Sequence, residues 1–207
     1  MNTKEKEPGS MPYLDESGGK IYRYPEVNKF NLDKDSHREV HEAVYYRYEV
    51  YPTREITKSS NYAGLCSLLR EGHPLDVFNF YLANYGGCCH SLINLINAIL
   101  DSTSFVHMHV TSPTYSAGST LALCGDSLNF RAYSYLMFHN YSSVAEGKGR
   151  ELLDSVEASD KWIKDYMNNL HRPFLTKKEC IRIDNDGDVR IWYNEKDLAE
   201  RLARHFK

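Results

Sequence analysis

The chain of 207 residues is long enough for one domain with a sizeable hydrophobic core. A formal net charge of −3 at pH 7 gives no basic surface for nucleic acid, and the sequence contains no apolar run long enough to predict a membrane span. Five cysteines without a repeating spacing argue against a disulfide framework, so we expect a reduced, cytoplasmic protein, in the host cytoplasm if the gene is viral.

The first 45 residues are expected to form an N-terminal extension. Pro and Gly punctuate a polar sequence over roughly the first 20 residues, which predicts a mobile arm. The segment "DKDSHREVHEAV" (33–44) predicts a short helix. From residue 46 to residue 207 the pattern changes, and we expect the main domain there.

Strand and helix patterns alternate along this second part of the chain. Strands are predicted by "YRYEVY" (46–51), "DVFNFYLA" (76–83), "FVHMHV" (105–110) and "YSYLMF" (133–138), and helices by 59–72, 90–100, 118–123 and 149–170. Such alternation predicts an α/β fold with parallel strands and right-handed crossovers. In sheets of this kind, ligands and chemistry gather beyond the carboxyl ends of the strands.

Three successive strand ends carry groups suited to acyl transfer. Ser116, in "SPTYSAGS", and His139 follow two of these strands, so a hydroxyl and a base can meet there. Gly86 and Gly87 end the preceding strand, where a backbone without Cβ can approach a substrate closely. The N–H of Ala117 opens the next helix. The order of these residues predicts a serine nucleophile with backbone donors for an oxyanion.

The segments "NYGGCCHSLINLINAIL", "YSAGSTLALCG" and "YLMFHN" together resemble the ClpP family, the proteolytic subunits of Clp proteases. They resemble its Gly-Gly loop and following helix, its nucleophile segment and the segment around its catalytic histidine. The resemblance runs from about residue 46 to the end of the sequence. It implies the ClpP/crotonase-like spiral of repeated β-β-α units with a protruding handle helix, 149–170. It also implies a serine endopeptidase that needs no cofactor and cuts unfolded proteins or peptides inside an oligomeric chamber.

Carried over onto this chain, the catalytic roles of the family fall on residues already singled out. Ser116 matches the nucleophile and His139 the general base, and the N–H groups of Gly87 and Ala117 match the oxyanion hole. The spacing from Gly87 places Ser116, rather than Ser119, at the nucleophile position.

Three residues are candidates for the acid of the Ser-His-Asp triad. Matching "DNDGDVRI" to the acidic run of the family favours Asp188, while Asp186 and Asp184 are the alternatives.

The resemblance also implies partners. We expect homo-oligomeric rings paired through the handle helix, an unfolded polypeptide as substrate and an AAA+ unfoldase as a candidate partner. Two other functions stay open at this point. One is a catalytically silent ring subunit or binding module, and the other is a crotonase-type enzyme acting on coenzyme A thioesters.

Metal binding is not favoured by either of the two patterns that suggest it. His37 and His41 have the spacing of helical zinc ligands, but the glutamate is one position too late for a zinc peptidase. The segment "DNDGDVRIWYNE" has a valine where a calcium loop requires glycine. We therefore expect no metal site.

Overall fold

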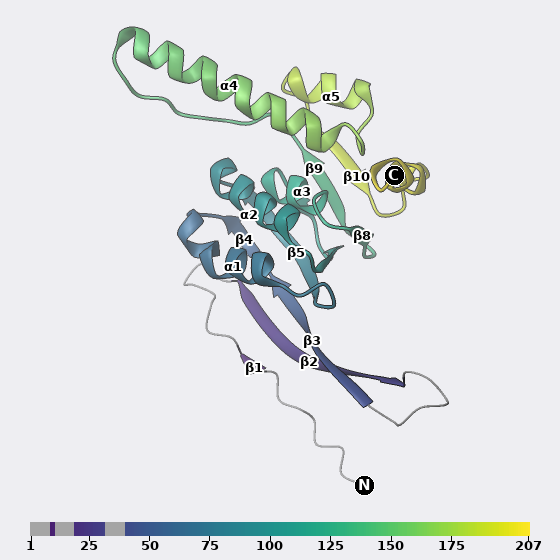
Figure 1. Ribbon diagram of the computed structural model, residues 1–207. Coiled ribbons are helices and arrows are strands. Elements are labelled where there is room, and N and C mark those ends of the chain that lie inside the picture. The colour runs from purple at the N-terminus through teal and green to yellow at the C-terminus, as the bar shows by residue number, and fades with distance from the viewer. Residues whose placement is uncertain (1–8, 11–18, 32–39) are drawn as a thin grey trace.

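The computed structural model describes residues 9–10, 19–31 and 40–207 (Figure 1). In this part of the chain the protein is a mixed α/β structure with a seven-stranded and a three-stranded sheet. The strands are β1 (Gly9–Ser10), β2 (Lys20–Asn31), β3 (Val40–Tyr51), β4 (Thr53–Ile56), β5 (Val77–Gly87), β6 (Phe105–Val110), β7 (Thr114–Tyr115), β8 (Ser127–Phe130), β9 (Tyr135–Phe138) and β10 (Val189–Trp192). The helices are the 3-10 helix η1 (Ser59–Tyr62), α1 (Ala63–Glu71), α2 (Cys89–Asp101), α3 (Ala117–Ala122), α4 (Gly149–His171), α5 (Lys177–Asp184) and α6 (Leu198–His205).

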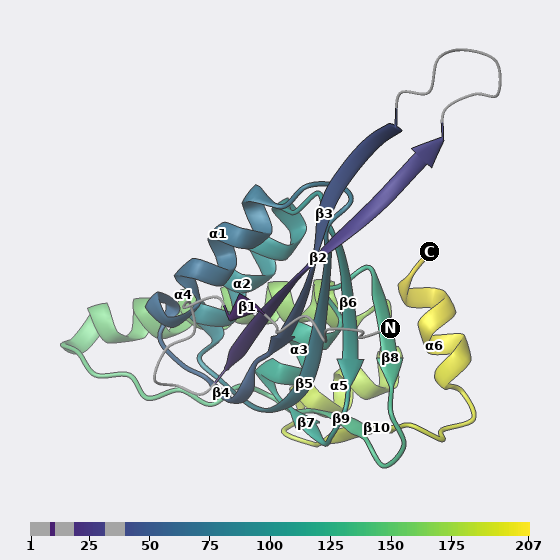
Figure 2. The same ribbon diagram turned by 90° about the horizontal axis from the view of Figure 1, so that it is seen from below.

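The large sheet has the strand order β1-β2-β3-β5-β6-β8, with β4 also paired to β5. The strands β3, β5, β6 and β8 run parallel to one another, as the alternation of strands and helices predicted. In contrast, β2 and β3 pair antiparallel along their whole lengths and form a ribbon that extends beyond the other strands (Figure 2).

The β2–β3 ribbon shows that the described part of the expected N-terminal extension pairs with the main sheet. Strand β3 runs through the expected boundary at residues 45 and 46. Residues 40–44 of the expected helix belong to this strand, so that prediction is wrong for them; residues 33–39 lie outside the described residues, as does most of the expected mobile arm. The valines and tyrosines of "VHEAVYYRYEVY" favour an extended chain, and pairing with β2 satisfies its backbone.

Helices α1, α2 and α3 cover one face of the large sheet and enclose the core (Figure 2). Along β5 every second side chain points into it, and Phe78, Phe80 and Leu82 are fully buried. Leu69 of α1 and Leu95 of α2 are equally buried against this face. Apolar side chains alternate along the strand and form a stripe on each helix. The helices therefore pack as a layer on this face of the sheet.

The small sheet has the order β10-β9-β7 and lies beside the large one. Strand β7 pairs parallel with β9, with Tyr115 opposite Met137. Strand β10 pairs antiparallel with the other edge of β9, with Val189 opposite Phe138. The strand predicted over 133–138 therefore exists, but it belongs to a second sheet rather than following β6 in the first.

From residue 149 onward the chain is mainly helical, apart from strand β10. Helix α4 has 23 residues and projects past the rest of the molecule (Figure 1). Helix α5 begins with a capping box in which Thr176 and Glu179 bond each other's backbone. Buried Arg201 of α6 reaches back to Glu179 at 2.8 Å and so joins the last two helices.

Among the helices in the described part of the chain, none combines the length and the apolar character needed to cross a bilayer.

Candidate functional site

The site is built around the turn between β7 and α3, residues 115–118, which we name the Ser116 turn. Ser116 has φ 56° and ψ −126°, a conformation that residues with a Cβ rarely adopt. Its N–H donates to the carbonyl of Met137 at 2.8 Å, and its carbonyl accepts from the N–H of Thr120 at 3.1 Å. A sharp, strained turn from strand to helix is the geometry that presents a serine hydroxyl for attack.

The hydroxyl of Ser116 is available for chemistry. The residue is half-buried, and within the described part of the chain its Oγ makes no hydrogen bond. Ser119, the alternative nucleophile, is fully buried. Its Oγ lies 2.8 Å from the carbonyl oxygen of Thr114 and 2.9 Å from that of Met137, and it accepts from the N–H of Met137 at 3.1 Å. Ser119 therefore joins β7 to β9 and has no free hydroxyl.

The end of β5 packs directly against the Ser116 turn. A Cβ on Gly86, whose φ is 95°, would come within 2.6 Å of the Ser116 Cβ and 3.2 Å of the Ala117 nitrogen. Only glycine fits at this distance and this φ. Buried Asn84 fixes the bend, because its Oδ1 accepts from the N–H of Gly86 at 2.8 Å and its Nδ2 donates to the carbonyl of Pro52 at 3.2 Å.

Of the two glycines, the one that contacts Ser116 is Gly86. Gly87, matched to the oxyanion hole, lies one residue further along and pairs with Ile56 of β4. A Cβ on Gly87 would collide with the backbone of Ile56. Asn84 is not among the residues predicted from the sequence, where its only signal is a polar residue inside an apolar strand.

His139 follows the end of β9, next to the strand that leads to Ser116. Since Tyr115 lies opposite Met137 in this parallel pair, Ser116 and His139 follow the ends of adjacent strands, as predicted. Their side chains form no hydrogen bond with each other in the part of the chain that the structure describes. The two residues thus follow adjacent strand ends, but their side chains are not hydrogen-bonded to each other in the described structure.

Asp188 reaches the same region from the other edge of β9. Since Val189 lies opposite Phe138, extending the ladder by one residue sets Asp188 opposite His139. Side chains at directly opposed positions share a face of the sheet. The carboxylate of Asp188, 40% exposed, accepts from Nη2 of Arg190 at 2.9 Å.

The two alternative acids lie in the turn that ends α5. Asp186 has φ 59°, and its Oδ1 accepts from Nδ2 of Asn140, the residue after His139, at 3.0 Å. The N–H of Gly187 donates to the carbonyl of Arg182 at 2.8 Å, so the segment "DNDG" closes the helix. Asp184, the last residue of α5, points into a small pocket.

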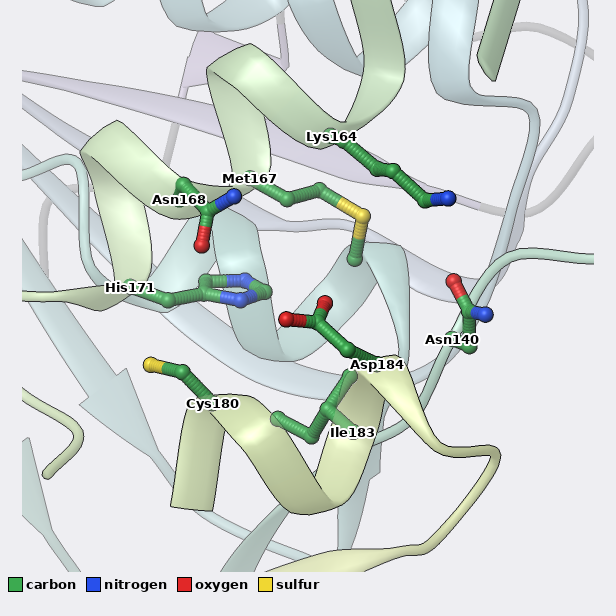
Figure 3. Close-up of a pocket in the computed structure, with 8 residues that line it drawn as sticks. All are labelled: Asn140, Lys164, Met167, Asn168, His171, Cys180, Ile183 and Asp184. Carbon is green, nitrogen blue, oxygen red and sulfur yellow. The ribbon is translucent and has the colours of Figure 1, made fainter. Parts of the chain in front are cut away.

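This pocket lies between α4, α5 and the chain after β9 (Figure 3). Its volume of about 20 Å³ has room for a single water molecule, so it cannot hold a peptide. The ring of His171 and the carboxylate of Asp184 both point into it (Figure 3). Burial lowers the pKa of His171 to about 4, and its Nε2 lies 2.9 Å from Oγ1 of Thr120. His171 is not among the site residues predicted from the sequence.

The described residues contain no group of three or more His, Cys, Asp or Glu side chains that could hold a metal ion. His37 and the side chain of His41 lie outside the described residues.

No protein-family model matches this chain, and no curated protein matches it.

Proposed function

We propose that the protein is a serine endopeptidase of the ClpP type, which hydrolyses peptide bonds through an acyl-enzyme on Ser116. The observation that carries the proposal is the strained turn at Ser116. Its half-buried hydroxyl makes no hydrogen bond within the residues that the structure describes, and the backbone of Gly86 and of Ala117 lies beside it. A nucleophile next to backbone donors is the arrangement that acyl transfer requires.

In the proposed reaction, His139 takes the proton of Ser116 while Oγ attacks the carbonyl carbon of the scissile bond. The backbone N–H groups of Ala117 and Gly87 donate to the oxyanion that forms. His139 then returns the proton to the leaving amine, and a water molecule hydrolyses the acyl-enzyme by the same route. The step requires Ser116 and His139 to come into hydrogen-bond contact, and such catalytic bonds often form only when substrate is bound.

Asp188 is the proposed orienting acid, because the ladder between β9 and β10 sets it opposite His139. Its carboxylate must then exchange the exposed partner Arg190 for the imidazole. Exposed ion pairs contribute about 0–1 kcal/mol, so this exchange has a small cost. Asp186 and Asp184 are the alternatives, since both lie near Asn140.

The proposal includes the ClpP-like spiral, with α4 as the handle helix through which rings of this chain pair. In support, the projecting helix exposes Leu153, Val156 and Trp162. Apolar side chains on a protruding element indicate a contact with another protein. The substrate would be an unfolded polypeptide, delivered by an AAA+ unfoldase or entering by diffusion. All five cysteines are free, which fits a reducing cytoplasm.

The experiment is labelling with a fluorophosphonate, followed by intact-mass measurement and mapping of the modified residue. We expect one adduct, on Ser116. Ser116→Ala should abolish the adduct and lower peptide hydrolysis by at least about 10⁴-fold, with little change in stability because Oγ makes no hydrogen bond in the described chain. An adduct that persists in Ser116→Ala contradicts the assignment.

The acid is tested with three matched variants, Asp188→Asn, Asp186→Asn and Asp184→Asn. Loss of the orienting acid should slow labelling by about 10²- to 10⁴-fold in one variant only, and we expect that variant to be Asp188→Asn. Equal rates in all three contradict a triad.

One observation favours a second candidate, a catalytically silent ring subunit. Asp188 is bonded to Arg190, and Ser116 is not bonded to His139 within the described residues. A protein that assembles into rings but gives no fluorophosphonate adduct would establish this alternative.

A further inference from the structure

His171 ends α4 and hydrogen-bonds the helix that begins at the Ser116 turn. Its Nε2 lies 2.9 Å from Oγ1 of Thr120, on α3. The same hydroxyl donates to the carbonyl oxygen of Ser116 over a long 3.4 Å, and the N–H of Thr120 donates to that oxygen at 3.1 Å. The carbonyl of the strained serine is therefore held by Thr120, and Thr120 is held by His171.

Packing alone does not explain a histidine at this position. The side chain is almost fully buried, and its ring meets the ring of Phe138 edge to face at 5.0 Å. Leucine or phenylalanine would fill the same space without the cost of burying a polar imidazole. What histidine adds is the bond to Thr120, with a ring that burial keeps neutral by lowering its pKa.

The strained backbone of the Ser116 turn is what the hydrogen bond between His171 and Thr120 helps to hold. Backbone conformations of this kind persist only where the surroundings hold them from several sides. On the strand side, Ser119 bonds both Thr114 and Met137. On the helix side, Thr120 and His171 are the corresponding pair.

We propose that His171 is a positioning residue, which acts through Thr120 to hold the Ser116 turn in the conformation that presents the hydroxyl. The imidazole donates its Nε2–H to Oγ1 of Thr120, and the hydroxyl of Thr120 donates to the carbonyl of Ser116. We name these two hydrogen bonds the His171 relay. An effect of the relay on catalysis rests on the proposed function of Ser116, whereas the relay itself does not. Because His171 ends α4, a displacement of the last turn of this helix reaches the nucleophile through two hydrogen bonds.

The first test measures the relay without using activity. Amide hydrogen exchange is compared in Thr120→Val, which keeps the shape of the side chain and loses its hydroxyl, and in Thr120→Ser, which keeps the hydroxyl. We expect exchange in residues 117–121 to be about fivefold to tenfold faster in Thr120→Val and in His171→Leu, and close to wild type in Thr120→Ser. In the wild type, nitrogen NMR should show a neutral His171 protonated at Nε2.

A control separates this local effect from general loss of stability. Val50→Ala changes a buried residue of β3, in the large sheet. It should speed exchange across the chain without singling out 117–121. Equal exchange in Thr120→Val and Thr120→Ser would overturn the proposal, as would an Nδ1-protonated ring.

The second test measures the consequence for the nucleophile. The rate constant for fluorophosphonate labelling should fall about tenfold in Thr120→Val and in His171→Leu, and stay within twofold of wild type in Thr120→Ser and Val50→Ala. The double variant should be no slower than either single variant, because both remove the same relay. Additive losses would overturn the proposal. If the wild type is not labelled, the proposed function fails, and the exchange experiment alone decides on the relay.

Discussion

The two sheets of this protein differ in how they are built. The large sheet contains the longest strands, β2, β3 and β5 with 11 or 12 residues each, and its core residues Phe78, Phe80 and Leu82 are fully buried under α1, α2 and α3. The small sheet joins strands of two to four residues from three distant parts of the chain. Candidate site residues Ser116, His139 and Asp188 adjoin the small sheet. The comparison indicates that the large sheet supplies most of the stability, while the small one sets the geometry of the site.

The largest effect on stability is expected in the large sheet. Phe80→Ala should lower the free energy of unfolding by about 4 kcal/mol, because it removes a fully buried ring. Urea denaturation followed by circular dichroism measures this loss. The matched variant is Leu136→Ala in β9, also fully buried, for which we expect about 3 kcal/mol and in addition slower labelling of Ser116 in the folded protein. An unchanged labelling rate in Leu136→Ala would contradict the role of the small sheet in setting the geometry of the site.

A smaller effect is expected from the serine that joins β7 to β9. Ser119→Ala removes the buried hydroxyl that bonds the backbone of both Thr114 and Met137, which should cost about 2 kcal/mol of unfolding free energy and slow labelling of Ser116. The control is Ser134→Ala, since Ser134 is equally buried and donates to the carbonyl of Arg131 in the turn before β9. Both variants should lose stability, but only Ser119→Ala should lose reactivity. Equal labelling rates would contradict the role given to Ser119.

An effect of about the same size is expected from the dependence of stability on pH. Burial lowers the pKa of His171 to about 4, whereas the pKa of an unfolded histidine is about 6.5. Between these values the unfolded chain binds more protons than the native protein, so the contribution of His171 is present above about pH 6.5 and is lost as the pH falls towards 4. From pH 7 to pH 5 this amounts to about 2 kcal/mol.

Urea denaturation at the two pH values checks the prediction in wild type and in His171→Gln. The glutamine variant should lose less stability on acidification, because its side chain does not titrate. Other groups with shifted pKa values, such as His109 and His205, stay the same in both proteins. The same pH dependence in both proteins would contradict a buried, neutral His171.

Strands β5 and β6 and the second half of β3 could be predicted from the sequence, because these segments are apolar or alternate with a period of two, whereas β2, β4 and β8 were not predicted. The strand around Phe80 alternates buried and partly buried residues, and the helix 90–100 has apolar residues at helical spacing. Strand β7, with two residues, is too short to have a period, and β10 has only four. Helix α5 did carry a signal, the capping box from Thr176 to Glu179, which the sequence analysis did not use.

For the candidate site, the sequence predicted which strand ends lie next to each other, but not the contacts that the side chains make there. The order of strand ends predicted that Ser116 and His139 follow neighbouring strands, and the pairing of β7 with β9 confirms this. It did not predict which glycine contacts Ser116, because Gly86 and Gly87 differ only in backbone angles and in what surrounds them. Nor did it predict the bond from His171 to Thr120, since no local pattern relates residues so far apart.

The antiparallel pairing of β10 with β9 has a consequence for the order of events during synthesis. Strand β10 leaves the ribosome long after β7 and β9 have emerged, because α4 and α5 lie between them in the sequence. A nascent chain can therefore assemble its main hydrophobic layer while Asp188 is still missing. If the protein is the proposed peptidase and Asp188 is required, a newly made chain would remain inert towards neighbouring nascent chains until β10 has emerged from the ribosome.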